Sequence, residues 1–113
     1  MSYKFRAIYT KPSDEVSLHT PPSGLYDLVN TMFDEGKITQ KPIRTTDGLN
    51  ETFEIVFANE AAYNEWKGNV VVQENAAARS ENCTANSISF SSKENSIKLI
   101  IETMHENFFT STI

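Results

Sequence analysis

Histidine is the side chain that most readily exchanges a proton near neutral pH, and the chain contains two of them, His19 and His105. His19 lies in a polar stretch, directly before Thr20 and two prolines. It is either a general base at the mouth of a pocket or a solvated loop residue. We favour the loop residue, because nothing in the sequence gives it a partner. Two histidines so far apart lack the spacing of a metal site, and we expect no metal and no cofactor.

An aromatic pair and one arginine are the candidate substrate-binding residues. Tyr63 and Trp66 stand three positions apart in a stretch with helical spacing, so their rings share one helix face. Such a pair lines a pocket for an aromatic molecule or fills the core, and we favour the core. Arg44 has the geometry to bind a substrate carboxylate with two hydrogen bonds. The interpretation that we favour is an exposed cross-strand partner for a carboxylate.

Composition argues against several classes of protein. The chain has 113 residues and a net charge of −5, and its 10 Lys and Arg residues are scattered. Phosphate recognition needs such residues in a cluster, so we expect no nucleic-acid binding. No apolar stretch is long enough to cross a bilayer and the N-terminus has no apolar signal core, so we expect no membrane contact and a cytoplasmic location. Cys83 is the single cysteine, and no neighbouring base would activate it.

The first part of the chain predicts a strand, a loop and a helix. Apolar and polar side chains alternate over residues 3–10, which predicts a half-buried strand, and a polar loop follows over 11–22. Ser23 is placed to cap a helix whose apolar residues recur at helical spacing. Gly36 stands where a left-handed residue would end that helix.

A hairpin is the next predicted element. Asp47 and Gly48 suit the centre of a tight turn, with strands over 38–46 and 49–57 on either side. Pro42 removes one backbone donor from the first of these strands. We therefore expect that strand to lie at a sheet edge or to carry a bulge.

A second helical region follows the hairpin. Asn59 is a good cap for it, and Glu60 is favourable in its first turn. Gly68 and Asn69 are expected to break or bend the helix. The alanine-rich run after them favours a second helical piece over residues 70–79.

The last part of the chain predicts β structure. Ile88 and Phe90 mark a first short run, residues 97–101 a second, and the "SSKEN" stretch between them has turn-like composition. The second run is apolar on both faces, as in a central or interface strand. Phe108 and Phe109 are expected to dock on the body of the protein or on a partner subunit.

The order strand, helix, strand, strand, helix, strand is that of the ferredoxin-like βαββαβ fold. This is an α+β class in which two helices cover one face of an antiparallel sheet. We expect residues 1–113 to form one such domain. The other sheet face is bare in this architecture, and a second subunit covers it most simply. We therefore expect a homodimer through the open sheet face.

The stretch "VFANEAAYNEW" resembles the dimeric α+β barrel superfamily, and in particular its antibiotic-biosynthesis-monooxygenase-like proteins. Its members often show a strand that ends in an aromatic residue, a small capping residue, and a helix with an aromatic residue followed by a tryptophan. The matching positions here are Phe57, Asn59, Tyr63 and Trp66. The resemblance implies a homodimer with facing sheets, in which each subunit holds a pocket between its sheet and its helices. Haem-degrading relatives use a histidine on the second helix, which this chain lacks, so haem is not expected.

Two functions remain open from the sequence. The first is binding of a small apolar or aromatic molecule between sheet and helices, because no paired acid and base, nucleophile–base pair or metal cluster is visible. The alternative, implied by the resemblance, is a cofactor-independent monooxygenase or isomerase. In that case Tyr63, Trp66 and Arg44 would orient the substrate and His19 would take a proton. The position of the Tyr63 and Trp66 rings, in a pocket or in the core, distinguishes the two.

Overall fold

The structure, a computed structural model, describes residues 1–96. The strand expected over residues 97–101 and the docking expected of Phe108 and Phe109 lie outside this range. The elements in chain order are β1 (Tyr3–Thr10), α1 (Ser23–Asp34), β2 (Ile38–Asp47), β3 (Asn50–Phe57), α2 (Glu60–Gly68), α3 (Val70–Asn86) and β4 (Ser89–Ser96).

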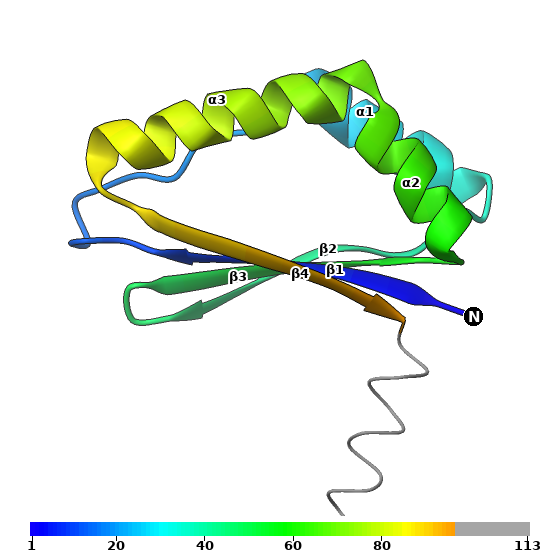
Figure 1. The fold of residues 1–113 in the computed structure, drawn as a ribbon, viewed down its shortest axis with the longest axis horizontal. Helices are drawn as coiled ribbons and strands as arrows, with labels where there is room; N and C mark the ends of the chain where they lie inside the picture. Colours follow the sequence, from blue (N-terminus) through cyan, green and yellow to red (C-terminus); the bar gives the residue numbers. More distant parts are fainter. Residues whose placement is uncertain (97–113) are drawn as a thin grey trace, which may run out of the picture.

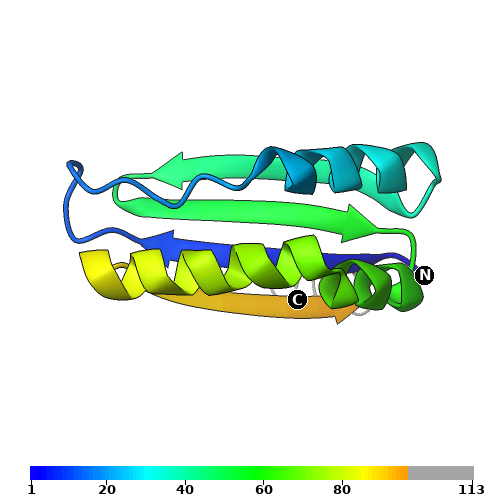
Figure 2. The same cartoon turned by 90° about the horizontal axis from the view of Figure 1, so that it is seen from above.

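The strands form a sheet in the order β2-β3-β1-β4, and each neighbouring pair is antiparallel. The three helices of residues 1–96 lie on one face of this sheet (Figure 1). Seen from above, α1 runs along the β2 side and α3 along the β1 and β4 side (Figure 2). This is the ferredoxin-like α+β fold, with its second helix divided into two pieces. The predicted fold class is confirmed.

β1 is a central strand and divides the molecule into two environments. It pairs along its whole length with β3 on one side and β4 on the other. Because successive side chains point to opposite faces, Ala7 turns toward the helices and its neighbour Ile8 turns toward the open face. Ala7 is buried, whereas Arg6 on the open face is exposed.

The hairpin turn lies one residue later than predicted. β2 continues to Asp47, which pairs with Asn50, so the two central turn residues are Gly48 and Leu49. Gly48 has a φ of +60° and Leu49 does not have a positive φ, which is the pattern of a type II′ turn. Only the first central residue must then be a glycine, and Gly48 supplies it.

The expectation drawn from Pro42 is confirmed. β2 lies at an edge of the sheet. Its pairing with β3 also shifts register between Ile38 and Gln40, and again between Gln40 and Ile43. Proline has no backbone N–H to donate to a neighbouring strand. At a sheet edge, and where the strand pairing is irregular, that missing hydrogen bond costs little.

The helix ends follow local capping chemistry with one exception. Ser23 is not a cap: Pro22 takes the capping position in an extended conformation, and Ser23 is the first helical residue. The helix starts one residue earlier than predicted, because the carbonyl of Pro22 accepts a hydrogen bond from the Leu25 N–H. Asn59 caps α2 as predicted, with its Oδ1 2.8 Å from the Ala62 nitrogen. Gly36 has the expected positive φ, +77°.

The second helical region breaks at Asn69, as predicted, but its second piece is longer than predicted. Asn69 is extended and its Oδ1 accepts from the Val71 nitrogen at 2.9 Å, so this one side chain starts α3. The helix runs past Arg79 to Asn86 and ends at Ser87, which adopts the left-handed conformation. The buried Cys83 anchors the additional turns to the sheet layer.

The "SSKEN" stretch is not a turn, and that prediction was wrong. It lies within β4, which pairs residue by residue with β1 from Ser89 to Ser96. β4 is an edge strand with exposed side chains, so polar residues cost little there. Pairing with the central strand outweighs the local preference for a turn.

The densest packing lies at one end of the layer between helices and sheet. The largest fully buried side chains are Phe57 and Ile38. They join one buried cluster with residues of α1, β3 and α2: Val29, Met32, Ile55, Ala62 and Tyr63. α2 covers this end, and the rest of the layer is filled less completely.

Candidate functional site

A cavity of about 750 Å³ occupies the remaining space between the sheet and the helices. We call it the sheet–helix cavity. Its volume falls within the range of about 300–1,000 Å³ that is usual for small-molecule sites. Side chains of β1, β2, β3, α1, α2 and α3 and of the loop over 11–22 line it, among them Phe5, Ala7, Tyr9, His19, Tyr26, Arg44, Phe53, Trp66, Asn75 and Arg79.

The loop over 11–22 forms one wall of the cavity and is attached to α3 by side chains. His19 Nε2 lies 2.9 Å from Asn75 Oδ1, and Asn82 Nδ2 donates to the Ser17 carbonyl at 3.4 Å. These hydrogen bonds join segments far apart in the sequence. The position of the loop is therefore set by α3.

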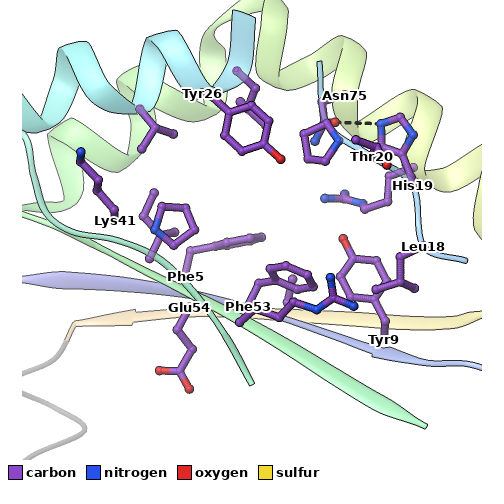
Figure 3. Close-up of a pocket in the computed structure, with 18 of the residues that line it drawn as sticks. Phe5, Tyr9, Leu18, His19, Thr20, Tyr26, Lys41, Phe53, Glu54 and Asn75 are labelled. Carbon is purple, nitrogen blue, oxygen red and sulfur yellow. Dashed lines mark hydrogen bonds between the residues drawn. The ribbon is translucent and has the colours of Figure 1, made fainter. Parts of the chain in front are cut away.

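Aromatic rings and hydroxyls face each other across the cavity. Figure 3 shows Phe5 and Phe53 on the sheet side, with the hydroxyls of Tyr9 and Tyr26 directed into the space from opposite sides. The carboxylate of Glu54 points away from the cavity, below the sheet. An aromatic molecule placed here would contact ring faces and meet a few polar groups.

His19 has the hydrogen-bonding partner that the sequence did not reveal. The carboxamide oxygen of Asn75 only accepts hydrogen bonds, so Nε2 of His19 carries the proton. In that arrangement Nδ1 carries the lone pair of the neutral ring. The ring is half-buried and lines the cavity. Among residues 1–96 Nδ1 has no hydrogen-bonding partner, so it can take a proton from a molecule in the cavity.

Tyr63 and Trp66 lie in different surroundings. Tyr63 is only 4% exposed and packs against Tyr3 and Phe57, with ring centroids 5.0 and 5.5 Å away. Burial raises the pKa of the Tyr63 hydroxyl, and the Glu94 carboxylate adds to that effect, so the phenol stays neutral. Tyr63 belongs to the core and is not among the residues that line the cavity.

Trp66 reaches the cavity and also contacts the core. Its ring centroid lies 5.6 Å from that of Phe5 and 5.5 Å from that of Phe57. Its buried Nε1 donor finds no acceptor among residues 1–96. Since Trp66 is the only tryptophan in the chain, its fluorescence reports on this part of the cavity.

Arg44 is a cross-strand partner for a carboxylate at the edge of the cavity. Its Nε donates to Oε2 of Glu51, and its guanidinium lies over the Phe53 ring, 5.5 Å from the centroid. Thr46 Oγ1 also donates to both Glu51 oxygens, at 3.0 and 3.1 Å. The guanidinium of Arg44 hydrogen-bonds to Glu51 and thereby lowers the pKa of that carboxyl, against the opposing effect of burial.

The sequence did not single out Tyr9, Asn75 or Arg79 as site residues. Tyr9 lies on the apolar face of an alternating strand, and alternation alone does not indicate whether its hydroxyl reaches a cavity. Arg79 lies at helical spacing from the buried residues Val72 and Cys83, which puts it on the face of α3 that turns toward the sheet. From that spacing the position of Arg79 next to the sheet could have been predicted.

Other kinds of site find no support in the described part of the chain. Within residues 1–96 no group of three or more His, Cys, Asp or Glu side chains could hold a metal ion. No helix in this range is both long enough and apolar enough to cross a membrane.

Comparison with known proteins shows similarity in fold. No family model matches the chain, and no curated protein matches it. The crystal structure of protein SO0527 from Shewanella oneidensis is similar, with a TM-score of 0.51 at 15% identity over 81% of this chain and 88% of that one. The structure of Rv0793 from Mycobacterium tuberculosis has a TM-score of 0.48 at 12% identity over 83% of this chain and 93% of that one. At these identities the similarity concerns the fold alone.

The Glu51 carboxylate predicts a pH-dependent contribution to stability. The pKa of Glu51 is lower in the folded chain than its ordinary value of 4.5, so ionised Glu51 stabilises the fold above that pH. We expect Glu51→Gln to lower the free energy of unfolding at pH 7 by about 1–2 kcal/mol, a modest value because the side chain of Arg44 is half exposed. Urea denaturation between pH 3 and 7 measures the difference between the two proteins.

That difference should stay constant from pH 7 to about pH 5 and shrink in more acidic solution, as Glu51 of the wild-type chain takes up a proton. Glu65→Gln is the matched control, because Glu65 pairs with Lys37 in solvent and should contribute less than about 1 kcal/mol. A difference that does not change with pH would contradict the prediction.

Proposed function

We propose that this protein binds a small, flat, apolar or aromatic molecule in the sheet–helix cavity. The observation that supports this most directly is a cavity of about 750 Å³ with aromatic rings from four elements around it. These rings are Phe5 and Tyr9 of β1, Phe53 of β3, Tyr26 of α1 and Trp66 of α2.

The placement of these rings favours a planar ligand. Phe5 and Phe53 lie on the sheet side and Tyr26 on the helix side (Figure 3). A flat ring system between them would contact aromatic faces on both sides, the offset arrangement that aromatic groups prefer. The small side chain of Ala7 leaves room on the floor between the rings. The two tyrosine hydroxyls supply the few polar contacts that fix orientation in such sites.

N-phenyl-1-naphthylamine, a neutral aromatic fluorophore, tests this proposal. We expect its emission to rise on binding and to accept energy from Trp66. Ala7→Leu adds volume on the sheet side of the cavity, between the rings of Phe5 and Phe53, and should weaken binding by at least about tenfold, because the added side chain occupies the space of the ligand. Fluorescence titration measures both effects.

The matched control is Val70→Leu, which adds volume at a residue that is 61% exposed in the helix layer and does not line the cavity. It should leave the affinity unchanged. Absence of binding to the wild-type protein, or equal binding by Ala7→Leu, would contradict the proposed function.

We also propose that two copies associate through the open sheet face. No helix of residues 1–96 covers that face (Figure 1). It carries the side chains of Ile8 and Ile43, the latter 52% exposed, beside a charged group in which Glu54 pairs with Lys4 and Arg6. An apolar centre beside polar and paired charged groups is typical of surfaces that associate.

Sedimentation velocity tests this association. We expect a dimer for the wild-type chain and a shift to monomer for Ile8→Arg, which would bring like charges together at the centre of the interface. Val70→Arg is the control, since Val70 is 61% exposed in the helix layer and should have no effect. A monomeric wild-type protein at micromolar concentration would contradict the proposal.

A second candidate function is cofactor-independent oxidation or isomerisation, favoured by the free Nδ1 of His19 in the cavity wall. An aromatic substrate with an acidic C–H bond would lose its proton to Nδ1. The resulting carbanion would transfer electrons to dioxygen and form a C–O bond, and the proton on His19 would return to the peroxide to give a hydroperoxide, which loses water to leave a ketone. The substrate itself supplies these electrons, so the chemistry needs no cofactor. The Asn75 hydrogen bond would hold the ring in position for that transfer.

Oxygen uptake with anthrone, a flat aromatic molecule with an acidic C–H bond, tests the second candidate. We expect His19→Gln to reduce the rate by about 100-fold or more if His19 is the base. Asn75→Ala should reduce it less, because the base remains but its orientation is lost. Equal rates for His19→Gln and the wild-type protein would remove His19 from the chemistry.

A further inference from the structure

We infer that the molecule bound in the sheet–helix cavity is an aromatic carboxylate, and that Arg79 and Tyr9 hold its carboxylate group. This inference rests on the proposed function, since it names the chemical class of the molecule that the cavity takes.

The charges around the cavity are predominantly positive although the chain as a whole carries −5. The cationic side chains that line it are Lys11, Lys41, Arg44 and Arg79, and the acidic ones are Asp14 and Glu54. Asp14 is an exposed loop residue. The carboxylate of Glu54 points below the sheet, where Lys4 and Arg6 pair with it. The interior of the cavity therefore favours an anion.

Arg79 differs from the other cations in its surroundings. Arg44 already donates to Glu51, and Lys11 is near enough to the same carboxylate to help lower its pKa. Lys41 is exposed and lies over the Phe33 ring. Arg79 is half-buried and forms no ion pair with a carboxylate of residues 1–96. A charge removed from water in this way attracts an opposite charge more strongly than one on the surface.

The guanidinium of Arg79 is held beside an aromatic ring. Its central carbon lies over the Phe90 ring, 4.2 Å from the centroid. The guanidinium also hydrogen-bonds to the Tyr9 hydroxyl, and its other N–H groups can donate to a ligand. Two of these groups match the two oxygens of one carboxylate.

Tyr9 supplies a further donor beside Arg79. Its ring lies between Phe53 and Phe90, with centroids 5.6 and 5.0 Å away, and its hydroxyl is directed into the cavity (Figure 3). Burial raises the pKa of this hydroxyl and the nearby Arg79 guanidinium opposes the shift. The neutral hydroxyl can donate to the same carboxylate that Arg79 binds.

The remainder of the ligand is aromatic because the space next to this anchor is lined by rings. Phe5, Phe53 and Trp66 continue the lining away from Arg79 toward the packed core. A carboxylate at one end and a flat ring system at the other fit this division.

A pair of probes of the same shape, 2-naphthoate with a negative charge and neutral 2-naphthamide, tests the inference. Displacement of N-phenyl-1-naphthylamine in a fluorescence titration measures the affinity for each. We expect wild-type protein to bind 2-naphthoate at least about tenfold more tightly than 2-naphthamide, the value of a charge-assisted hydrogen bond. Arg79→Gln should abolish this preference without changing the affinity for 2-naphthamide.

Tyr9→Phe removes one hydroxyl, should reduce the preference severalfold, and provides a second test if Arg79→Gln is poorly folded by circular dichroism. The control Lys93→Gln removes one positive charge from the open sheet face, opposite Arg6, and should keep the full preference.

Equal affinity for the two probes, or a preference that survives in Arg79→Gln, would overturn the inference while N-phenyl-1-naphthylamine binding kept the proposed function intact. Failure of all three compounds to bind the wild-type protein would overturn both.

Discussion

Every feature of this molecule depends on the pairing of β1 with β3 and β4 in one register. Ala7 lies between Phe53 and Ser92, so the side chains of three strands face the helices at the same level. A slip of one residue would exchange the two faces of β1 and would turn Lys4 and Arg6 toward the core. The hydrogen bonds of the central strand therefore keep the charged and apolar faces apart.

The division of the helix layer into a packed end and a hollow end follows from the break at Asn69. α2 places Tyr63 in the core, where it meets rings of β1 and β3. The capped restart at Asn69 gives α3 a separate direction along the β1 and β4 side of the sheet (Figure 2). The space left under α1 and α3 holds small or polar side chains in addition to rings, and it forms the sheet–helix cavity.

The cations on the two sheet faces have different partners. On the open face Lys4 and Arg6 both pair with the carboxylate of Glu54. On the helix-facing side Glu51 pairs with Arg44, whereas Arg79 has an aromatic ring as its neighbour and no paired carboxylate among residues 1–96. A chain with a net charge of −5 thus holds a half-buried positive group where a ligand would bind.

The sequence by itself determined the fold class, β1, the break at Asn69 and the cap at Asn59, because alternation and capping are local properties of the chain. It did not determine β4, whose polar residues form a strand only because β1 offers a partner. Nor did it separate Tyr63 from Trp66, since helical spacing gives a shared face but not what lies opposite each ring. Tertiary structure alone brought Arg79 beside Tyr9 and His19 beside Asn75, because contacts between residues far apart in the chain depend on how α3 and the loop over 11–22 pack against the sheet.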